Sequence, residues 1–271
     1  MDPRLQLRVQ RYGWDRAAPV YDRAWARQLA PAQDLLLEMA GLREGEEVVE
    51  LACGSGLVTR RIAAAVGPTG IVVATDLSEK MITRARQAAA PDEWGHVTFR
   101  RMDAGALDLP DRRFDAALCS LGLMYVPDPA DALTEMFRVL RPGGRAVIAV
   151  WGRRRACGWA EVFPIVDARV ETEVCPLFFQ LGTGDSLRDA AVDAGFGEVR
   201  TERLATILEY ASPDEAVEAA FEGGPVAMAY SRFDDAIRSE IHRKYLDSIE
   251  EYHTDDGYLI PGEFVVVRGR R

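Results

Sequence analysis

The sequence predicts an α/β fold in which helices cover both faces of a mostly parallel β-sheet. Short β-branched runs alternate with Ala-rich stretches through the first half of the chain, and the turn sequences "GPTG" (67–70) and "RPGG" (141–144) separate them. This alternation is typical of βαβ units. With 271 residues, 48% of them hydrophobic, the chain is long enough for one large core. We therefore expect a single doubly wound α/β domain.

The elements can be placed in chain order from these runs. Strands are expected at residues 47–51, 71–76, 96–102, 114–120 and 146–151. Helices are expected at 31–41, 57–66, 78–90 and 129–140, and Ser78 is a suitable N-cap for the third of these. The second half is less regular, with a helix ending at Gly195, a strand at 199–210, two or three helices in 212–252 and a final strand at 263–270.

Composition excludes several classes of function. Lys and Arg number 33 against 43 Asp and Glu, which gives a net charge of −10 that would repel a nucleic-acid backbone. Four scattered cysteines without CxxC spacing indicate neither a zinc site nor a disulfide framework. We find no signal peptide and no apolar stretch of membrane-spanning length. A cytoplasmic protein without a metal site is expected.

The segment "VVELACGSGLVTR", residues 48–60, ends an apolar strand with Glu50 and continues into a loop that contains Gly54 and Gly56. Glycines there let a ligand approach the main chain. The GxGxxG pattern of dinucleotide-binding loops fails, because Thr59 occupies the third position. A carboxylate beside a helix N-terminus competes with phosphate but attracts an ammonium or sulfonium group. The loop therefore indicates a cationic ligand.

Two further acids follow the next two strands. Asp76 ends the second strand, where a carboxylate can accept hydrogen bonds from ribose hydroxyls. Asp103 follows the third strand, beside Ala104, whose N–H could meet an adenine nitrogen. Taken singly, Asp76 is equally well explained as a turn acid and Asp103 as a helix cap. Together with Glu50 they lie where open α/β sheets bind ligands, and we expect one nucleoside to contact all three.

Four successive segments resemble a known family. They are "VVELACGSG", "VVATDLSEKMITRAR", "RMDAGALDLPDRRFDAALCSLGLMYVPDP" and "EMFRVLRPGGRAVIAVW". In this order they closely resemble the motifs of class I S-adenosylmethionine-dependent methyltransferases, most of all the ubiquinone/menaquinone C-methyltransferase group and related small-molecule methyltransferases. The resemblance is strong over residues 45–151. It implies a Rossmann-like sheet of seven mostly parallel strands in the order 3-2-1-4-5-7-6, the last one antiparallel, with a helical cap inserted around the last strands.

The resemblance also implies a role for each candidate site residue. The methionyl part of S-adenosylmethionine would be held by Glu50, by Ala52, Gly54 and Gly56 of the loop, and by Ser120 nearby. The ribose would be bound by Asp76, and the adenine by Leu77, Met81, Asp103 and Ala104. The N-terminal segment, with Tyr12 and Tyr21, would fold over the cofactor.

The expected domain, residues 1–271, divides into five parts. They are an N-terminal helical lid (1–44), a cofactor-binding core (45–152), two cap insertions (153–184 and 212–260), and the last helix and strands (185–211 and 261–271). The implied activity is in-line transfer of a methyl group from S-adenosylmethionine to oxygen, carbon or nitrogen of a small molecule. A non-catalytic S-adenosylmethionine-binding protein and an NAD(P)-dependent oxidoreductase are the alternatives, and Thr59 opposes the second.

The partners expected are a small-molecule acceptor and no nucleic acid, since "SLGLM" (120–124) stands where nucleic-acid and protein N-methyltransferases of the family commonly carry [DN]PP[YF]. No integral membrane segment is expected, and a homodimer is left open. His242 and His253 are candidates either for a base or for surface residues. Arg153–Arg155 would either anchor an anionic acceptor or be solvated, and the cap aromatics would either line its pocket or pack the cap.

Overall fold

The computed structural model describes residues 3–89, 94–170 and 178–271. Within them, one mixed sheet has the strand order β3-β2-β1-β4-β5-β8-β6, and β7 pairs with β8. The strands are β1 (Glu47–Leu51), β2 (Ile71–Asp76), β3 (Val97–Arg101), β4 (Phe114–Ser120), β5 (Leu140–Trp151), β6 (Gly197–Tyr210), β7 (His253–Thr254) and β8 (Gly257–Arg270). Counted without the two-residue β7, this is the predicted order 3-2-1-4-5-7-6, and the antiparallel placement of β8 is also as predicted.

The central strands form because their sequences are apolar on both faces. β1 lies between β2 and β4 in parallel register, and its last four residues are buried. Strands covered on both faces read as continuous Val- and Leu-rich runs, which is why the bounds of β1, β2 and β4 were predicted correctly. β5 begins at Leu140, six residues before the predicted start, because the "RPGG" turn is accommodated as an irregularity in the β4–β5 pairing.

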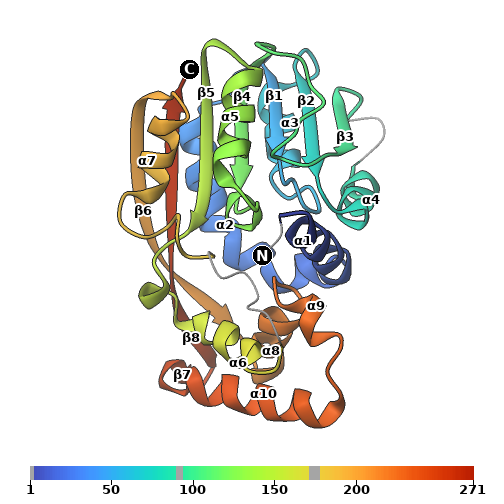
Figure 1. Cartoon of the computed structure of the whole chain (residues 1–271), viewed down its shortest axis with the longest axis vertical. Coiled ribbons are helices and arrows are strands. Elements are labelled where there is room, and N and C mark those ends of the chain that lie inside the picture. Colours follow the sequence, from blue (N-terminus) through green and yellow to red (C-terminus); the bar gives the residue numbers. More distant parts are fainter. Residues whose placement is uncertain (1–2, 90–93, 171–177) are drawn as a thin grey trace.

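Helices cover both faces of the sheet, with α2 behind β4 and β5 and with α5 and α7 in front (Figure 1). The helices are α1 (Pro3–Ala17), α2 (Tyr21–Ala40), α3 (Thr59–Val66), α4 (Glu79–Ala88), α5 (Pro129–Val139), α6 (Val162–Asp167), α7 (Ser186–Asp193), α8 (Pro213–Phe221), α9 (Ala227–Tyr230) and α10 (Asp235–Ser248). The Ser78 side chain caps α4 as predicted, since its Oγ accepts from the Met81 N–H at 3.1 Å.

Helix α2 starts ten residues before its predicted start and contains Pro31 in its interior. A proline is tolerated when packing outweighs the lost hydrogen bond. Here Trp25, Leu29 and Leu36 recur at helical spacing and are buried against the core. The helix ends at Gly41, whose φ of 52° is left-handed.

The last two long strands carry the cap. β6 and β8 have 14 residues each and pair along nearly their whole length, beyond the end of β5. Their lower part reaches α6, α8 and α10 (Figure 1). Strand β8 begins at Gly257, so the last four residues of the predicted insertion 212–260 lie in this strand.

Some expectations concern residues outside the described ranges. They are the predicted end of the third helix at residue 90, residues 171–177 of the first insertion, and Cys175. Among the described helices, none is both long and apolar enough to cross a membrane. Cys53, Cys119 and Cys157 are buried free thiols, and burial raises the pKa of each.

Candidate active site

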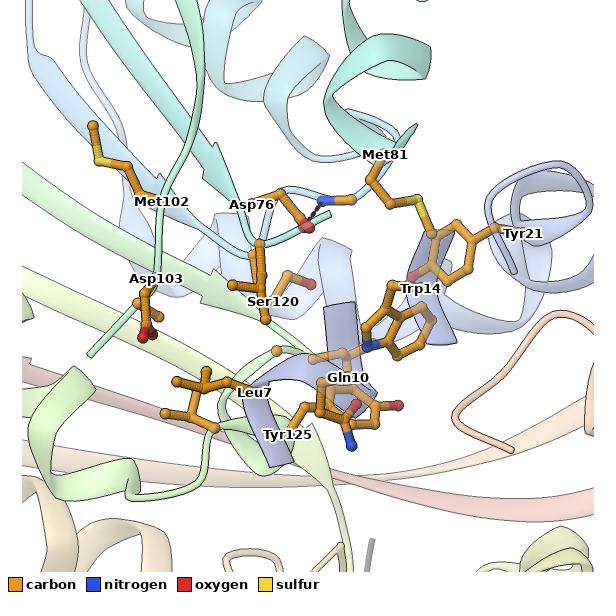
Figure 2. Close-up of a pocket in the computed structure, with 17 residues that line it drawn as sticks. Leu7, Gln10, Trp14, Tyr21, Asp76, Met81, Met102, Asp103, Ser120 and Tyr125 are labelled. Carbon is orange, nitrogen blue, oxygen red and sulfur yellow. Dashed lines mark hydrogen bonds between the residues drawn. The ribbon is translucent and has the colours of Figure 1, made fainter. Parts of the chain in front are cut away.

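A cavity opens at the carboxyl ends of β1 to β4, between these strand ends and helices α1 and α2 (Figure 2). It holds about 690 Å³ of space, part of it open to solvent. Seventeen residues line it: Leu7, Gln10, Trp14, Tyr21, Ala52, Gly54, Asp76, Leu77, Met81, Met102, Asp103, Ala104, Ser120, Leu121, Gly122, Tyr125 and Val126. The charged side chains among these are two carboxylates, so the cavity attracts a cation.

Asp76 fixes the two loops that form the cavity floor. One carboxylate oxygen accepts the Gly54 N–H at 2.8 Å (Figure 2). The other accepts the Ser78 N–H at 2.8 Å. Burial raises its pKa to about 6, against the opposing effect of these hydrogen bonds. Gly54 has a left-handed φ of 56°, which a side chain would strain. Asp76 and Gly54 together hold the loop after β1 against the cavity.

Glu50 lies behind this loop and does not line the cavity. It is 1% exposed, and the Thr59 hydroxyl donates to its carboxylate at 2.6 Å. Burial raises its pKa to about 8, and the Asp76 charge adds to the rise, although the Thr59 bond opposes it. Thr59, which replaces the third glycine of a dinucleotide loop, thus serves as the hydrogen-bond donor to Glu50. Gly56 also lies behind the residues that line the cavity. Because it has no side chain, Ala85 of α4 can pack closely against it.

Asp103 and Ala104 border the opposite end of the cavity (Figure 2). One Asp103 oxygen accepts the Gly105 N–H at 2.9 Å, which holds the turn after β3. Met102 adds apolar surface on this side, whereas Met81 of α4 lies beside Tyr21 (Figure 2). Leu77, in the turn before α4, also lines the cavity. This end offers a flat group apolar contacts and a carboxylate acceptor.

The end of β4 supplies the wall next to the glycine loop. Ser120 Oγ is buried and has no hydrogen-bond partner among the described residues. Leu121 follows with a left-handed φ of 58°. A β-carbon on Gly122 would lie 2.3 Å from that of Ala52, so the two loops touch only because residue 122 is glycine. The strained turn and the unpaired hydroxyl both point to a ligand-binding function.

The N-terminal helices close the cavity. Leu7, Gln10 and Trp14 face it from α1, and Tyr21 faces it from the start of α2 (Figure 2). Tyr12 lies on the other side of α1, 45% exposed, because two residues along a helix reverse the direction of a side chain. Tyr12 therefore lies away from the cavity. Trp14 lines the cavity instead, where Tyr12 was expected.

Two acids of this segment hold it on the core. The Ser78 hydroxyl donates to Asp15 at 2.6 Å, and the Lys80 N–H donates to the same carboxylate oxygen at 3.2 Å. Asp22 accepts from the Ser55 hydroxyl and pairs with Arg84 at 3.2 Å. These contacts join the N-terminal helices to the loop after β1 and to helix α4 with its N-cap.

Comparison with known proteins identifies the family. A family profile described as "Methyltransferase domain" matches residues 49–148. The ubiquinone/menaquinone biosynthesis C-methyltransferase UbiE of Pseudomonas fluorescens is 32% identical over 182 residues, which cover 60% of this chain and 70% of that protein. The chain belongs to the S-adenosylmethionine-dependent methyltransferase family.

Two further relatives define how far the similarity extends. UbiE of Ectopseudomonas mendocina is 40% identical over 113 residues, 41% of this chain and 44% of that protein, so this match spans less than half of the relative. A phosphoethanolamine N-methyltransferase 2 of Haemonchus contortus, solved with S-adenosylhomocysteine, has a TM-score of 0.62 at 16% identity. The structural alignment covers 95% of this chain and 57% of the Haemonchus chain, and it shows that the two chains share a fold.

The cavity at the carboxyl ends of β1 to β4 brings together most of the site residues predicted from the sequence. Those that line it are Tyr21, Ala52, Gly54, Asp76, Leu77, Met81, Asp103, Ala104 and Ser120, whereas Tyr12, Glu50 and Gly56 do not. The sequence analysis missed Leu7, Gln10, Trp14, Met102, Leu121, Gly122, Tyr125 and Val126. Residues 7, 10 and 14 have the spacing of one helix face, and this pattern could have identified them from the sequence.

The residues of the predicted cap that were candidates for a base or for an acceptor pocket lie elsewhere in the structure. His242 bonds the Tyr230 hydroxyl at 3.0 Å and contacts Phe221 within the cap, while His253 is exposed beside Tyr258. Arg153 pairs with the buried carboxylate of Glu263, and Arg154 pairs with Glu161 at the surface. The aromatics Phe163, Phe178 and Phe179 pack around Trp159. None of these residues lines the cavity described above.

Proposed function

We propose that this cavity binds S-adenosylmethionine and that the protein transfers its methyl group to oxygen, carbon or nitrogen of a small molecule. The arrangement of Asp76 is the main support. Each of its oxygens accepts one backbone N–H, and a carboxylate oxygen can accept two hydrogen bonds. One lone pair on each oxygen is therefore left for two neighbouring ribose hydroxyls. Asp103 and Ala104, at the other end, offer an acceptor and an N–H to adenine.

The methionyl end fits the strained turns at Ala52–Gly54 and Ser120–Gly122. The unpaired Ser120 hydroxyl meets its hydrogen-bonding requirement on a polar amino-acid group. The acidic lining suits a ligand that bears ammonium and sulfonium charges and opposes a pyrophosphate. When bound, S-adenosylmethionine supplies an electrophilic methyl group; the residues of the chain orient it and exclude water.

The same proposal assigns functions to the parts of the domain. Residues 1–44 act as a lid, residues 45–152 bind the cofactor, and the insertions 153–184 and 212–260 surround the acceptor. The hydrogen bonds that the Ser78 and Ser55 hydroxyls donate to Asp15 and Asp22 support the lid, because they connect it directly to the cofactor loops.

Isothermal titration calorimetry with S-adenosylmethionine and S-adenosylhomocysteine tests the proposal. Asp76→Ala and Gly54→Ala should abolish measurable binding, with thermal melts to verify folding. Asp108→Asn is the matched control, since its side chain is 92% exposed and does not line the cavity. Unchanged affinity in both cavity variants would overturn the proposal.

Turnover is tested separately from binding. The protein is incubated with S-adenosylmethionine labelled in its methyl group and with the small-molecule fraction of a cell extract. Label transferred to a product by the wild type but not by Asp76→Ala indicates an enzyme. Tight binding without transfer would indicate a non-catalytic binding protein, and a fluorescence change with NADH would favour an oxidoreductase.

A further inference from the structure

A pocket lined by arginines, which we call the arginine pocket, lies at the end of the sheet opposite the proposed cofactor cavity. It contains about 810 Å³ of space, part of it open to solvent. Its walls come from the end of α2, the loop before β1, the starts of β4 and β5 and the end of β8, beside the point marked C in Figure 1. The charged residues that line it are Arg43, Glu46, Asp115, Arg141, Arg145, Arg268 and Arg270. Positive charge is thus concentrated here in a chain whose net charge is −10.

Both carboxylates of the pocket are already paired within the protein. Asp115 pairs with Arg141 at 2.9 Å, and Glu46 accepts hydrogen bonds from Arg145 at 3.0 Å and 2.7 Å. Arg145 is also held by two carbonyl groups at the end of α2, and its side chain is only 11% exposed. These two arginines are therefore neutralised, and the positive charges of the other three arginines remain.

The three remaining arginines have little negative charge beside them. Arg268 makes no ion pair with any carboxylate among the described residues. Arg43 interacts with Glu46, whose carboxylate is already bonded to another arginine. Arg270 lies 3.6 Å from Glu198, but the Glu198 side chain is 72% exposed, and an ion pair in such a position contributes little. The pocket therefore offers guanidinium groups to a ligand.

The strand register increases this concentration of charge. Arg145 of β5 lies directly opposite Arg270 of β8, and Arg200 of β6 lies directly opposite Arg268 of β8. Residues in these positions share one face of the sheet, and like charges directly opposite each other are destabilising. Burial and the charges of the other three arginines lower the pKa of Arg268, although Glu198 opposes the change. A bound anion would relieve this repulsion.

The arrangement favours a ligand group with more than one negative charge. Guanidinium groups match the oxygens of phosphate and carboxylate, and each can donate two parallel hydrogen bonds. Three uncompensated charges attract a phosphate or diphosphate more strongly than a single carboxylate. The acidic chain as a whole opposes a long polyanion such as nucleic acid.

We propose that the arginine pocket binds the phosphate or diphosphate group of a small soluble molecule through Arg43, Arg268 and Arg270. The pocket is separate from the cofactor cavity, and none of its lining residues belongs to that cavity. The proposal therefore goes beyond the proposed function and does not depend on it.

Calorimetry on the full chain with pyrophosphate, in metal-free buffer with 0.15 M potassium chloride, tests the proposal. Arg268→Gln should weaken binding at least tenfold, because it removes a guanidinium group and its charge. Arg101→Gln is the matched control, since Arg101 is an exposed strand arginine of β3 that does not line the pocket. It should leave the affinity within about twofold, and so should Asp76→Ala in the cofactor cavity.

A second measurement separates ligand binding from a structural role of Arg268. Without pyrophosphate, Arg268→Gln should raise the urea midpoint of unfolding, because it removes the repulsion from the neighbouring arginines. With pyrophosphate, the melting temperature should rise more in the wild type than in this variant. A variant that is less stable than the wild type but binds pyrophosphate equally well would overturn the proposal.

Other results would also contradict it. They are the absence of pyrophosphate binding by the wild type at millimolar concentration, equal losses in Arg268→Gln and Arg101→Gln, and loss of binding in Asp76→Ala, which would place the anion in the cofactor cavity. Sedimentation with phosphatidylcholine vesicles that contain phosphatidic acid distinguishes a lipid headgroup from a soluble ligand. Binding to these vesicles without binding to free pyrophosphate would overturn the assignment to a soluble molecule.

Discussion

Replacing Glu50 by Gln should stabilise the ligand-free protein at neutral pH and above. Glu50 is buried with one hydroxyl donor, and its pKa is raised from 4.5 to about 8. Between these two values the folded chain holds a proton that the unfolded chain has released. Stability therefore falls as pH rises through this window. Gln retains a carbonyl oxygen for the Thr59 hydroxyl and has no charge to bury.

The size of the effect follows from the pKa difference. One pKa unit corresponds to about 1.4 kcal/mol. At pH 7, 2.5 units above the ordinary value, Glu50 lowers the free energy of unfolding by about 3 kcal/mol relative to its effect below pH 4.5. Above pH 8 the loss levels off near 5 kcal/mol, which is an upper limit because local water entry relaxes the penalty. The advantage of Glu50→Gln over the wild type should rise along this curve.

Urea unfolding followed by tryptophan fluorescence, without cofactor, at pH 3, 4, 5, 6, 7 and 8 measures this difference. Glu46→Gln serves as the control of opposite sign. Burial acts to raise the pKa of Glu46, but hydrogen bonds from Arg145 and the Arg43 N–H outweigh it and lower the pKa. That variant should lose stability relative to the wild type as pH rises from 3 to 5. A Glu50→Gln advantage that stays constant from pH 5 to 8 would refute the reasoning.

Three further substitutions probe the site and its supports. Gly122→Ala should weaken S-adenosylmethionine binding at least tenfold in calorimetry, since the new methyl group meets Ala52, and the double variant with Ala52→Gly should recover most of the loss. Asp15→Asn weakens the acceptor of the Ser78 hydroxyl and should speed cofactor dissociation several-fold in stopped-flow measurements. Arg138→Lys should lower the free energy of unfolding by about 2 kcal/mol in urea, because Lys cannot replace a guanidinium that binds two carboxylates and two backbone carbonyls.

The cofactor half of the fold was predictable because its signals are local. β1, β2 and β4 are short, largely apolar runs, and their hydrophobic pattern alone determines their bounds. Asp76 and Asp103 end or follow such strands, so the parallel topology brings them to one edge. Their convergence therefore needed no knowledge of side-chain contacts.

The orientation of the N-terminal helices and the tryptophan cluster were not predictable in the same way. Trp25, Trp151 and Trp159 lie up to 134 residues apart in the sequence, and only the packed structure brings them into one cluster. Tyr12 and Trp14 are both aromatic residues of α1, and the helix orientation alone decides which faces the cavity. The position of Glu50 was difficult to predict for a different reason. The sequence showed an acid near a strand end, but it did not show that a hydrogen bond from Thr59 would hold this acid behind the loop.

The charge distribution connects binding with turnover. Asp76 and Asp103 line the cofactor cavity, Glu50 lies behind it, and no Lys, Arg or His is among the described lining residues. A cationic ligand therefore lowers the pKa of Asp76 and Glu50 and releases protons to the buffer when it binds near pH 7. Methyl transfer leaves a neutral sulfur in the product, so part of this attraction is lost. If the cavity acts as proposed, the same buried acids that cost the free protein stability favour the sulfonium donor over the product, whose sulfur is neutral.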